Sequence, residues 1–271
     1  MSWNNFKPTI WSRFIQQELD QKAKLVDFCN RKFEGEAKKG ETVRILNAPS
    51  PTIKNYVPGV DIDAPEAWDG IYTELKINQM KYFNFGVDDV DRMQSIPGMM
   101  EAVMIAQAKK MLVEREVFVG SLATEATHSS ASTQIGTAAA AKKAVDAGLL
   151  VLRENGVSVD DDVHIELAPF VYQLLRDSIV EVNTNNVDII HRGVVGMYDG
   201  ALVVLSNNLH KDETDTYCMI RTKDAIAFAS GIDELEAYRP EKGFADAVKG
   251  LNVFGGKLVR PDELYVIKAH K

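Results

Sequence analysis

Residues 41–87 read ETVRILNAPSPTIKNYVPGVDIDAPEAWDGIYTELKINQMKYFNFGV. Glu41–Leu46 and Thr52–Val57 are predicted strands with prolines between them, and Tyr72–Val87 alternates between apolar and polar side chains as a strand does. The intervening Pro58–Gly70 is rich in proline, glycine and acidic residues, and a loop of this length is uncommon inside a compact domain. An isolated ribbon with apolar residues on both faces is marginally stable, so we interpret the stretch as a projecting hairpin laid across a neighbouring molecule.

Predicted helices flank this hairpin on both sides. Thr9–Lys32 approximates a helix with Thr9 as its N-cap. Ser95–Pro97 is a favourable helix start, and the apolar stripe that follows continues for about 25 residues. Thr137–Asn155 is a second predicted helix, which Gly156 would end. From Val163 onward short strands alternate with turns, so the sequence predicts a mixed α+β architecture.

Composition and charge exclude several classes of protein. The chain has 271 residues, with 31 Lys+Arg against 39 Asp+Glu and a net charge of −8. This acidic balance disfavours a protein that coats nucleic acid, because phosphate binding needs an excess of cations. No apolar run approaches the ~20 residues of a membrane span, and the first residues do not resemble a signal peptide. Two cysteines, Cys29 and Cys218, are too few for a disulfide framework and are interpreted as buried thiols.

The sequence offers only weak candidates for chemistry. The glycines of 193–200 do not match the spacing of a phosphate-binding loop. Asp88–Asp91 and Asp160–Asp162 supply the oxygen ligands that Mg²⁺ or Ca²⁺ prefers, but a helix start and a solvated turn explain them better. His164 and Glu166 share a strand face and could form an acid–base pair, although an exposed strand edge explains them equally well. We therefore predict no catalytic, cofactor-binding or metal site.

Several phrases follow one another in a characteristic order. They are FEG and GETVRI between 33 and 45, LKINQMKYFNF at 75–85 with DDVD at 88–91, HRGVVGMYDG at 191–200 with VVLSNNL at 203–209, and EAYRP, FADAVKG and FGGKLVRP between 236 and 261. In this order they resemble the major capsid proteins of tailed bacteriophages, which have the Hong Kong 97 fold. The resemblance implies an N-terminal arm (1–40), an extended β-hairpin loop (41–87), a peripheral domain with a long spine helix (88–136 and 224–271) and an axial domain (137–223).

The resemblance also implies a function. Hexamers and pentamers of the chain would close into an icosahedral head around double-stranded DNA, without sequence-specific contacts, in the host bacterial cytoplasm. A separate scaffolding protein, a portal and a possible decoration protein would be its partners, and no membrane, cofactor or enzymatic activity is implied. Some relatives join their subunits through isopeptide bonds to a loop-tip lysine; Pro58–Gly70 has none, so we predict a non-covalent shell. An encapsulin-type cellular compartment is the alternative, and a metal-dependent enzyme that uses the aspartate clusters is a remote one.

Contacts between subunits are expected at two places. The acidic loop tip would meet a basic patch of an adjacent subunit that includes Arg92, Lys109 and Lys110, although a solvated acidic loop would have the same composition. The expected contact residues are Asp61, Asp63, Glu66, Trp68 and Asp69 at the loop tip and Trp3, Trp11 and Phe14 in the N-terminal arm. Met100, Met104 and Met111 belong to the apolar stripe of the spine helix and are interpreted as adaptable packing residues.

Overall fold

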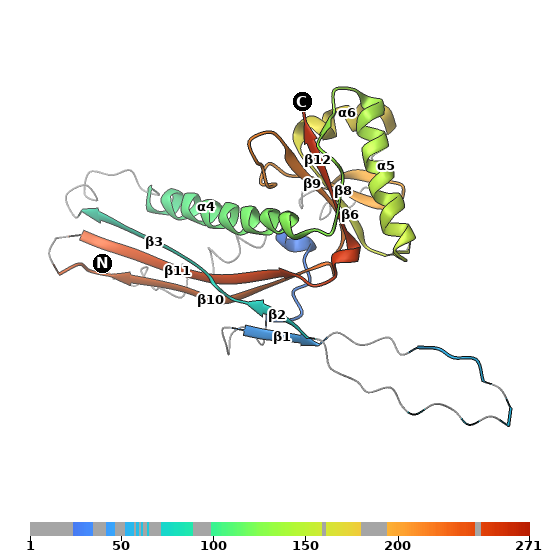
Figure 1. Ribbon diagram of the computed structural model, residues 1–271. Helices are drawn as coiled ribbons and strands as arrows, with labels where there is room; N and C mark the ends of the chain where they lie inside the picture. Colours follow the sequence, from blue (N-terminus) through green and yellow to red (C-terminus); the bar gives the residue numbers. More distant parts are fainter. Residues whose placement is uncertain are drawn as a thin grey trace.

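The computed structural model describes residues 24–34, 42–46, 52–56, 58–59, 61, 64, 72–88, 99–158, 161–179, 194–241 and 245–271. These residues form two bodies of different shape (Figure 1). The elongated body is a three-stranded sheet under a long helix, and the compact body is a seven-stranded sheet with two helices. The predicted α+β class is confirmed. None of the helices in the described ranges is long and apolar enough to cross a bilayer.

The elements follow one another along both bodies. In chain order they are η1 Val26–Phe28, β1 Thr42–Leu46, β2 Tyr72–Lys76, β3 Gln79–Asp88, α4 Met99–Ser121, η2 Leu122–Glu125, β4 His128–Ser129, β5 Thr133–Gln134, α5 Ala138–Glu154, β6 Val163–Leu167, α6 Pro169–Ile179, β7 Val194–Tyr198, β8 Ala201–Leu205, β9 Thr216–Thr222, β10 Ile226–Tyr238, β11 Ala245–Leu258, η3 Pro261–Glu263 and β12 Leu264–His270.

The elongated body consists of strands in the order β10-β11-β3, all antiparallel, with α4 along one face (Figure 1). At 1.5 Å per residue α4 is about 35 Å long, which confirms the predicted long helix. The sequence predicted short strands from Val163 onward, but between 226 and 258 the structure has two long ones, β10 and β11. Glycines inside β11 are sites of close approach rather than breaks: at Gly250 the ring of Phe83 lies where a Cβ would be, only 2.3 Å away.

The predicted hairpin is correct only at its base. β1 pairs with β2 in antiparallel register, from Thr42 opposite Lys76 to Leu46 opposite Tyr72. The predicted single run Tyr72–Val87, however, is divided at residues 77 and 78, and β3 pairs with β11 instead of continuing the ribbon. Strict alternation predicts a strand but not which sheet it joins, and this part of the prediction was wrong.

The compact body has the strand order β4-β12-β9-β6-β8-β7, and β5 also pairs with β12. Its local signals are where the sequence predicted them. The Thr137 side chain accepts a hydrogen bond from the Ala140 N–H at the start of α5, and Gly156 has a φ of 95° after its end. The turn between β7 and β8 contains Asp199 and Gly200, both with positive φ. β12 lies in this sheet, although the sequence-based division grouped residues 264–270 with the long helix.

The segment before β1 differs from the predicted helix. Residues 9–23 of that helix lie outside the described residues. The described remainder is one 3-10 turn, Val26–Phe28, which is buried between the two bodies. Leu25, Val26 and Cys29 belong to one hydrophobic core that also contains Val119 of α4 and Ile165 of β6, so the core is continuous across both bodies.

Candidate functional site

The sheet of the elongated body has two unlike faces. Alternation along β3 directs Met80 and Tyr82 to one face, opposite Val253 and Leu251 of β11. On this face Met80 is 63% exposed, Tyr82 81% and Leu251 38%. The other face packs against α4. Side chains this large and this exposed on one sheet face are typical of a surface that binds another protein.

Part of this exposed face is covered by the chain itself. The β1–β2 ribbon crosses the sheet at Gly255, where a Cβ would lie 2.2 Å from the carbonyl oxygen of Lys76. Side chains from the ribbon and the sheet form a separate small core, made of Val43, Ile45, Leu75, Ile77, Ala227, Ala229 and Val253. The apolar side of the ribbon that was expected to need a neighbouring copy is therefore sheltered by the chain's own sheet. Met80, Tyr82 and Leu251 lie outside this core.

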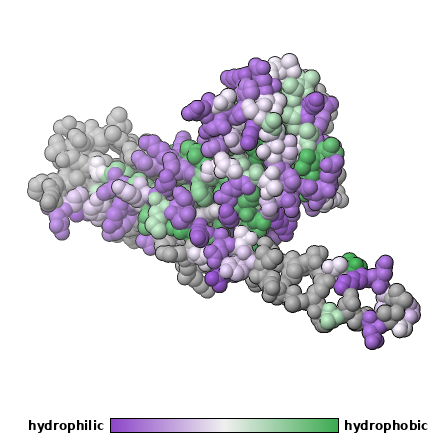
Figure 2. Space-filling view, viewed as in Figure 1, coloured by the Kyte–Doolittle hydropathy of each residue, from purple (hydrophilic) through white to green (hydrophobic). Residues whose placement is uncertain are grey.

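The described part of the extended loop carries apolar side chains away from both bodies. Thr52–Tyr56 has no regular secondary structure, so the strand predicted for Thr52–Val57 is not formed there. Ile53 is 98% exposed and Tyr56 71%. Figure 2 shows hydrophobic and hydrophilic side chains together on this projecting part. Exposing two large apolar side chains to water is unfavourable. Burial of this segment against another protein surface would therefore be favourable.

The residues singled out from the sequence, in the loop tip, the N-terminal arm and the spine helix, are only partly within the described structure. Asp61 is described and exposed. Met111 is 8% exposed and packs in the main core. The backbone of Met100 and Met104 is part of α4, but their side chains are outside the described structure. The predicted contact residues that lie outside the described residues are Asp63, Glu66, Trp68, Asp69, Trp3, Trp11 and Phe14.

A network of buried charges lies where the two bodies meet. Glu116 of α4 is 1% exposed, and its Oε1 accepts hydrogen bonds from the backbone N–H groups of Lys24, Leu25 and Val26 at 2.8, 2.8 and 3.3 Å. Arg221 of β9 is fully buried. Its guanidinium donates to both carboxylate oxygens of Glu166 and to the backbone carbonyls of Leu25 (2.9 Å) and Phe28.

Sequence reasoning missed most of this network. Glu116 and Arg221 were not singled out, because a charged residue in an apolar stripe has no visible partner in a single sequence. The signal was their position: Glu116 lies one helical turn after the buried Leu112, and Arg221 follows the buried Ile220 in a strand. His164 and Glu166 were noticed, but the exposed edge proposed for them is wrong. β6 lies between β8 and β9, and the two side chains are 2% and 0% exposed.

Burial determines the protonation of these groups. Burial, with Arg221 and Lys223 nearby, lowers the pKa of His164 to about 3, so its imidazole is neutral. Neither of its ring nitrogens has a hydrogen-bond partner among the described residues, and its ring lies 4.2 Å from that of Phe28. Burial raises the pKa of Glu116 and of Glu166, while hydrogen bonds to the carboxylates act in the opposite direction.

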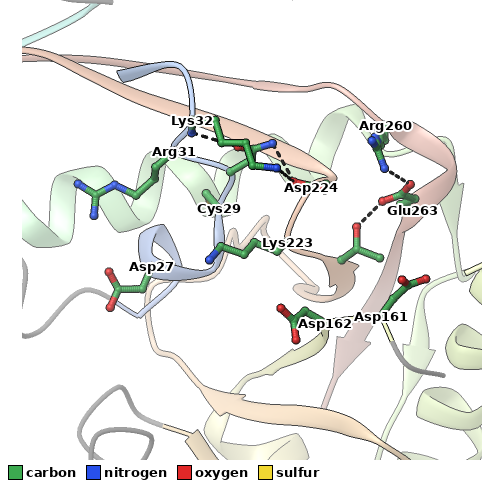
Figure 3. A pocket seen from close by; sticks show the side chains of 12 residues that line it. Asp27, Cys29, Arg31, Lys32, Asp161, Asp162, Lys223, Asp224, Arg260 and Glu263 are labelled. Carbon is green, nitrogen blue, oxygen red and sulfur yellow. Dashed lines mark hydrogen bonds and ion pairs between the residues drawn. The ribbon is translucent and has the colours of Figure 1, made fainter. Parts of the chain in front are cut away.

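A polar pocket of about 780 Å³ opens beside this network (Figure 3). Glu263 pairs with Arg260 at 2.8 Å and also accepts a hydrogen bond from Thr222. Cations and anions are mixed on the walls, so the pocket does not favour a ligand of one charge. No group of three His, Cys, Asp or Glu side chains in the described ranges could hold a metal ion. The charged lining residues are Arg31, Lys32, Lys223, Arg260, Asp27, Asp161, Asp162, Asp224 and Glu263.

One cluster superficially resembles catalytic machinery. Ser132, His270 and Asp215 lie together, with Ser132 Oγ 2.8 Å from the Asp215 carboxylate. Both Ser132 Oγ and Asp215 Oδ1 approach the same ring nitrogen of His270, Nδ1, at 3.3 and 2.9 Å. In a Ser–His–Asp triad the serine and the aspartate contact opposite ring nitrogens. This cluster therefore joins the C-terminal strand to neighbouring loops rather than activating the serine.

The buried cysteines agree with the prediction for their environment. Cys29 and Cys218 are both free and buried. Burial raises the pKa of Cys29 to about 11 and that of Cys218 to about 12, so both remain thiols near neutral pH.

Comparisons with known proteins identify solved structures that share this architecture. No family model and no curated protein matches the chain. Among solved structures, a chain of Mycobacterium phage Che8 is 28% identical, with a TM-score of 0.74 over 91% of each chain. The capsid of cyanophage P-SCSP1u has a TM-score of 0.69 at 14% identity, over 92% of this chain and 89% of that one. A virus-like particle from Pyrococcus furiosus has a TM-score of 0.56 at 14% identity, over 95% and 98%. The chain therefore has the fold of phage capsid structures, and the resemblance to tailed-phage major capsid proteins, predicted from the sequence, is confirmed.

Proposed function

We propose that this chain is the major capsid protein of a tailed phage, which assembles through hexamers and pentamers into an icosahedral head around double-stranded DNA. The observation that carries the proposal is the exposed apolar face of Met80, Tyr82 and Leu251 on a fold shared with phage capsids. Assembly in the bacterial cytoplasm, and a separate scaffolding protein, portal and decoration protein as partners, belong to the same proposal.

The extended loop is the proposed means of contact between neighbouring subunits. Ile53 and Tyr56 would supply apolar area, and Asp61 with the other tip acids would supply charge. On α4, Lys109 and Lys110 are exposed beside two exposed valines on the same helix face, Val113 and Val117. An acidic, partly apolar loop and a basic, partly apolar helix face are complementary. Charge would set the register, and many weak contacts would together hold the shell.

The domain division supports this arrangement and is part of the proposal. Residues 1–40 would form the N-terminal arm, 41–87 the extended loop, and 88–136 the start of the peripheral domain. The axial domain would contain the compact body. Because β4, β5 and β12 are strands of the compact sheet, we revise this division: residues 128–134 and Leu264–His270 belong to that body, and the two peripheral segments end near Glu125 and Pro261.

Charge reversal at the loop tip tests the function and the contact together. Asp61, Asp63, Glu66 and Asp69 are changed to Lys, and the particles are examined by electron microscopy. We expect closed shells from the native chain and none from the variant, whose unassembled chain should keep its circular dichroism spectrum. A compensating variant that also carries Lys109→Glu and Lys110→Glu should recover shells. Shells from the tip variant alone would contradict the contact, and no particles from the native chain with its neighbouring gene products would contradict the function.

Two further readouts separate the alternatives. A non-covalent shell should give only a 30.1 kDa band in a denaturing gel, whereas a ladder of multimers would indicate covalent joining. An encapsulin-type compartment is the second candidate, favoured by the likeness to the virus-like particle of Pyrococcus furiosus. Particles that package DNA in the presence of the phage proteins support the capsid, and particles that enclose a protein cargo and no DNA support the compartment.

A further inference from the structure

The short segment Lys24–Asn30 is held by both bodies at once. It contains a single 3-10 turn, yet Leu25, Val26, Phe28 and Cys29 are each at most 6% exposed. A single turn has little intrinsic stability, so its position depends on what it contacts. The segment lies within the N-terminal arm (residues 1–40) of the proposed function, after the part of the arm that is outside the described residues.

Each end of the turn meets a buried charge of the appropriate sign. The first N–H groups of a helical turn and its last carbonyls have no partner within the turn. Here the N–H groups of Lys24 and Leu25 each donate to the Glu116 carboxylate at 2.8 Å. At the other end the Phe28 carbonyl accepts from Arg221, which also donates to the carbonyl of the N-cap residue Leu25. Hydrogen bonds to a charged group are stronger than those between neutral groups, so these contacts hold the turn firmly.

The two charges come from different bodies of the molecule. Glu116 is on α4 of the elongated body, and Arg221 is on β9 of the compact body, where Glu166 fixes its guanidinium at 2.6 Å. A third attachment is made to β10: the Asn30 N–H donates to Ile226 at 2.9 Å, and its carbonyl accepts from the Phe228 N–H at 3.0 Å. The same few residues thus bridge α4, the seven-stranded sheet and the three-stranded sheet.

We infer that Lys24–Asn30 is a clasp, a conformational device that couples the N-terminal arm to the arrangement of the two bodies. If the hydrogen bonds from Arg221 of the compact body are broken, those to Glu116 of the elongated body break too. The reason is that Glu116 binds N–H groups that are ordered only while Arg221 binds the carbonyls. The consequence for assembly rests on the proposed function. A neighbouring copy that binds the arm would favour one angle between the two bodies, and that angle would in turn raise the affinity of the arm for the neighbour by the same factor.

Amide hydrogen exchange of the unassembled full chain tests the clasp across the junction. The variant Glu166→Met/Arg221→Met replaces the buried ion pair with apolar side chains and so avoids a lone buried charge. We expect the amides of Lys24, Leu25 and Val26, whose acceptor is Glu116 on the other body, to exchange about tenfold faster or more, as loss of one charged hydrogen bond predicts. Exchange in α5, which is remote from the segment, should be unchanged, as evidence that the variant is folded.

A reciprocal variant completes the test. Glu116→Gln should make the amides of Asn30 and Phe228 exchange faster. These two amides donate the two hydrogen bonds between the segment and β10. The matched control is Glu114→Gln on the same helix, which loses only a half-exposed ion pair with Lys81 and should leave these amides unchanged. Unchanged exchange of the Lys24, Leu25 and Val26 amides in the double variant, or of the Asn30 and Phe228 amides in Glu116→Gln, would overturn the clasp. Because exchange is measured before assembly, a failure here leaves the capsid proposal standing, and failure to form shells leaves the clasp standing.

Discussion

The two sheets of this molecule differ in how far their side chains are buried. In the compact body, β6 is buried along its whole length, even at two ionisable residues, His164 and Glu166. In the elongated body, β3 alternates between half-buried and exposed side chains, and the exposed ones include Met80 and Tyr82. Among the described residues, the compact body therefore covers its own sheet, whereas the elongated body leaves one apolar face uncovered. A shell needs this combination, a stable unit with one unfinished surface.

The largest effect is expected where the compact body buries charge. Arg221→Met leaves Glu166 unpaired in the core and removes two hydrogen bonds to the clasp. Loss of one partner of a buried ion pair costs about 3–5 kcal/mol. Urea unfolding of the unassembled chain measures this loss. The double variant Glu166→Met/Arg221→Met should recover much of it, and a single variant as stable as the native chain would show that the pair contributes little.

A pH dependence follows from the buried His164. The folded state lowers its pKa from 6.5 to about 3, so only the unfolded state binds a proton between these values. Stability from this group is present above pH 6.5 and is lost as the pH falls, at about 1.4 kcal/mol per pH unit, or about 3 kcal/mol at pH 4.5. The raised pKa values of Glu116 and Glu166 act in the opposite direction, since a folded state that holds protons more tightly gains stability as pH falls.

The comparison with His164→Leu isolates the histidine. Unfolding midpoints in urea at pH 7 and pH 4.5 are measured for both chains. The difference between the two pH values should be smaller in the variant by nearly the contribution of His164, because both carboxylates are retained. Equal pH dependence in the two chains would mean that the imidazole is hydrated in the native state.

Sequence patterns predicted the local elements of both bodies but not how the bodies join. Thr137 and Gly156 mark the ends of α5 because capping and positive φ are local requirements. Between Lys76 and Gln79 the chain passes from the β1–β2 ribbon to the three-stranded sheet, and no local pattern predicts this. The passage depends on Gly255, far along the chain, because only a residue without a Cβ lets the ribbon cross the sheet so closely. The clasp depends in the same way on Glu116 and Arg221, whose partners lie 55 to 196 residues away. A single sequence shows that a charge occupies an apolar position, but not what neutralises it.

Gly255 provides an intermediate effect, at the border between the covered and uncovered parts of the sheet face. In Gly255→Ala the new methyl would lie 2.2 Å from the Lys76 carbonyl oxygen, which is backbone and cannot move aside cheaply. Overpacking of this kind costs about 1–3 kcal/mol, and it should loosen the β1–β2 ribbon specifically. Exchange of the Val43 and Ile45 amides, with the urea midpoint, reports both effects. Gly136→Ala is the control, because a Cβ there meets nothing within 4 Å, and equal behaviour of the two variants would contradict the close crossing.

The smallest effect on stability is expected on the unfinished face itself. Tyr82→Ser removes a side chain that is 81% exposed, so the unassembled chain should change by less than about 0.5 kcal/mol. Assembly should respond differently, since the substitution removes apolar area from the surface proposed to be covered in the shell. Leu150→Ser on α5, at 56% exposure, is the matched substitution on the compact body. If light scattering shows that Leu150→Ser slows shell formation as much as Tyr82→Ser does, then exposed apolar area matters wherever it lies, and the distinction between a complete and an unfinished body fails.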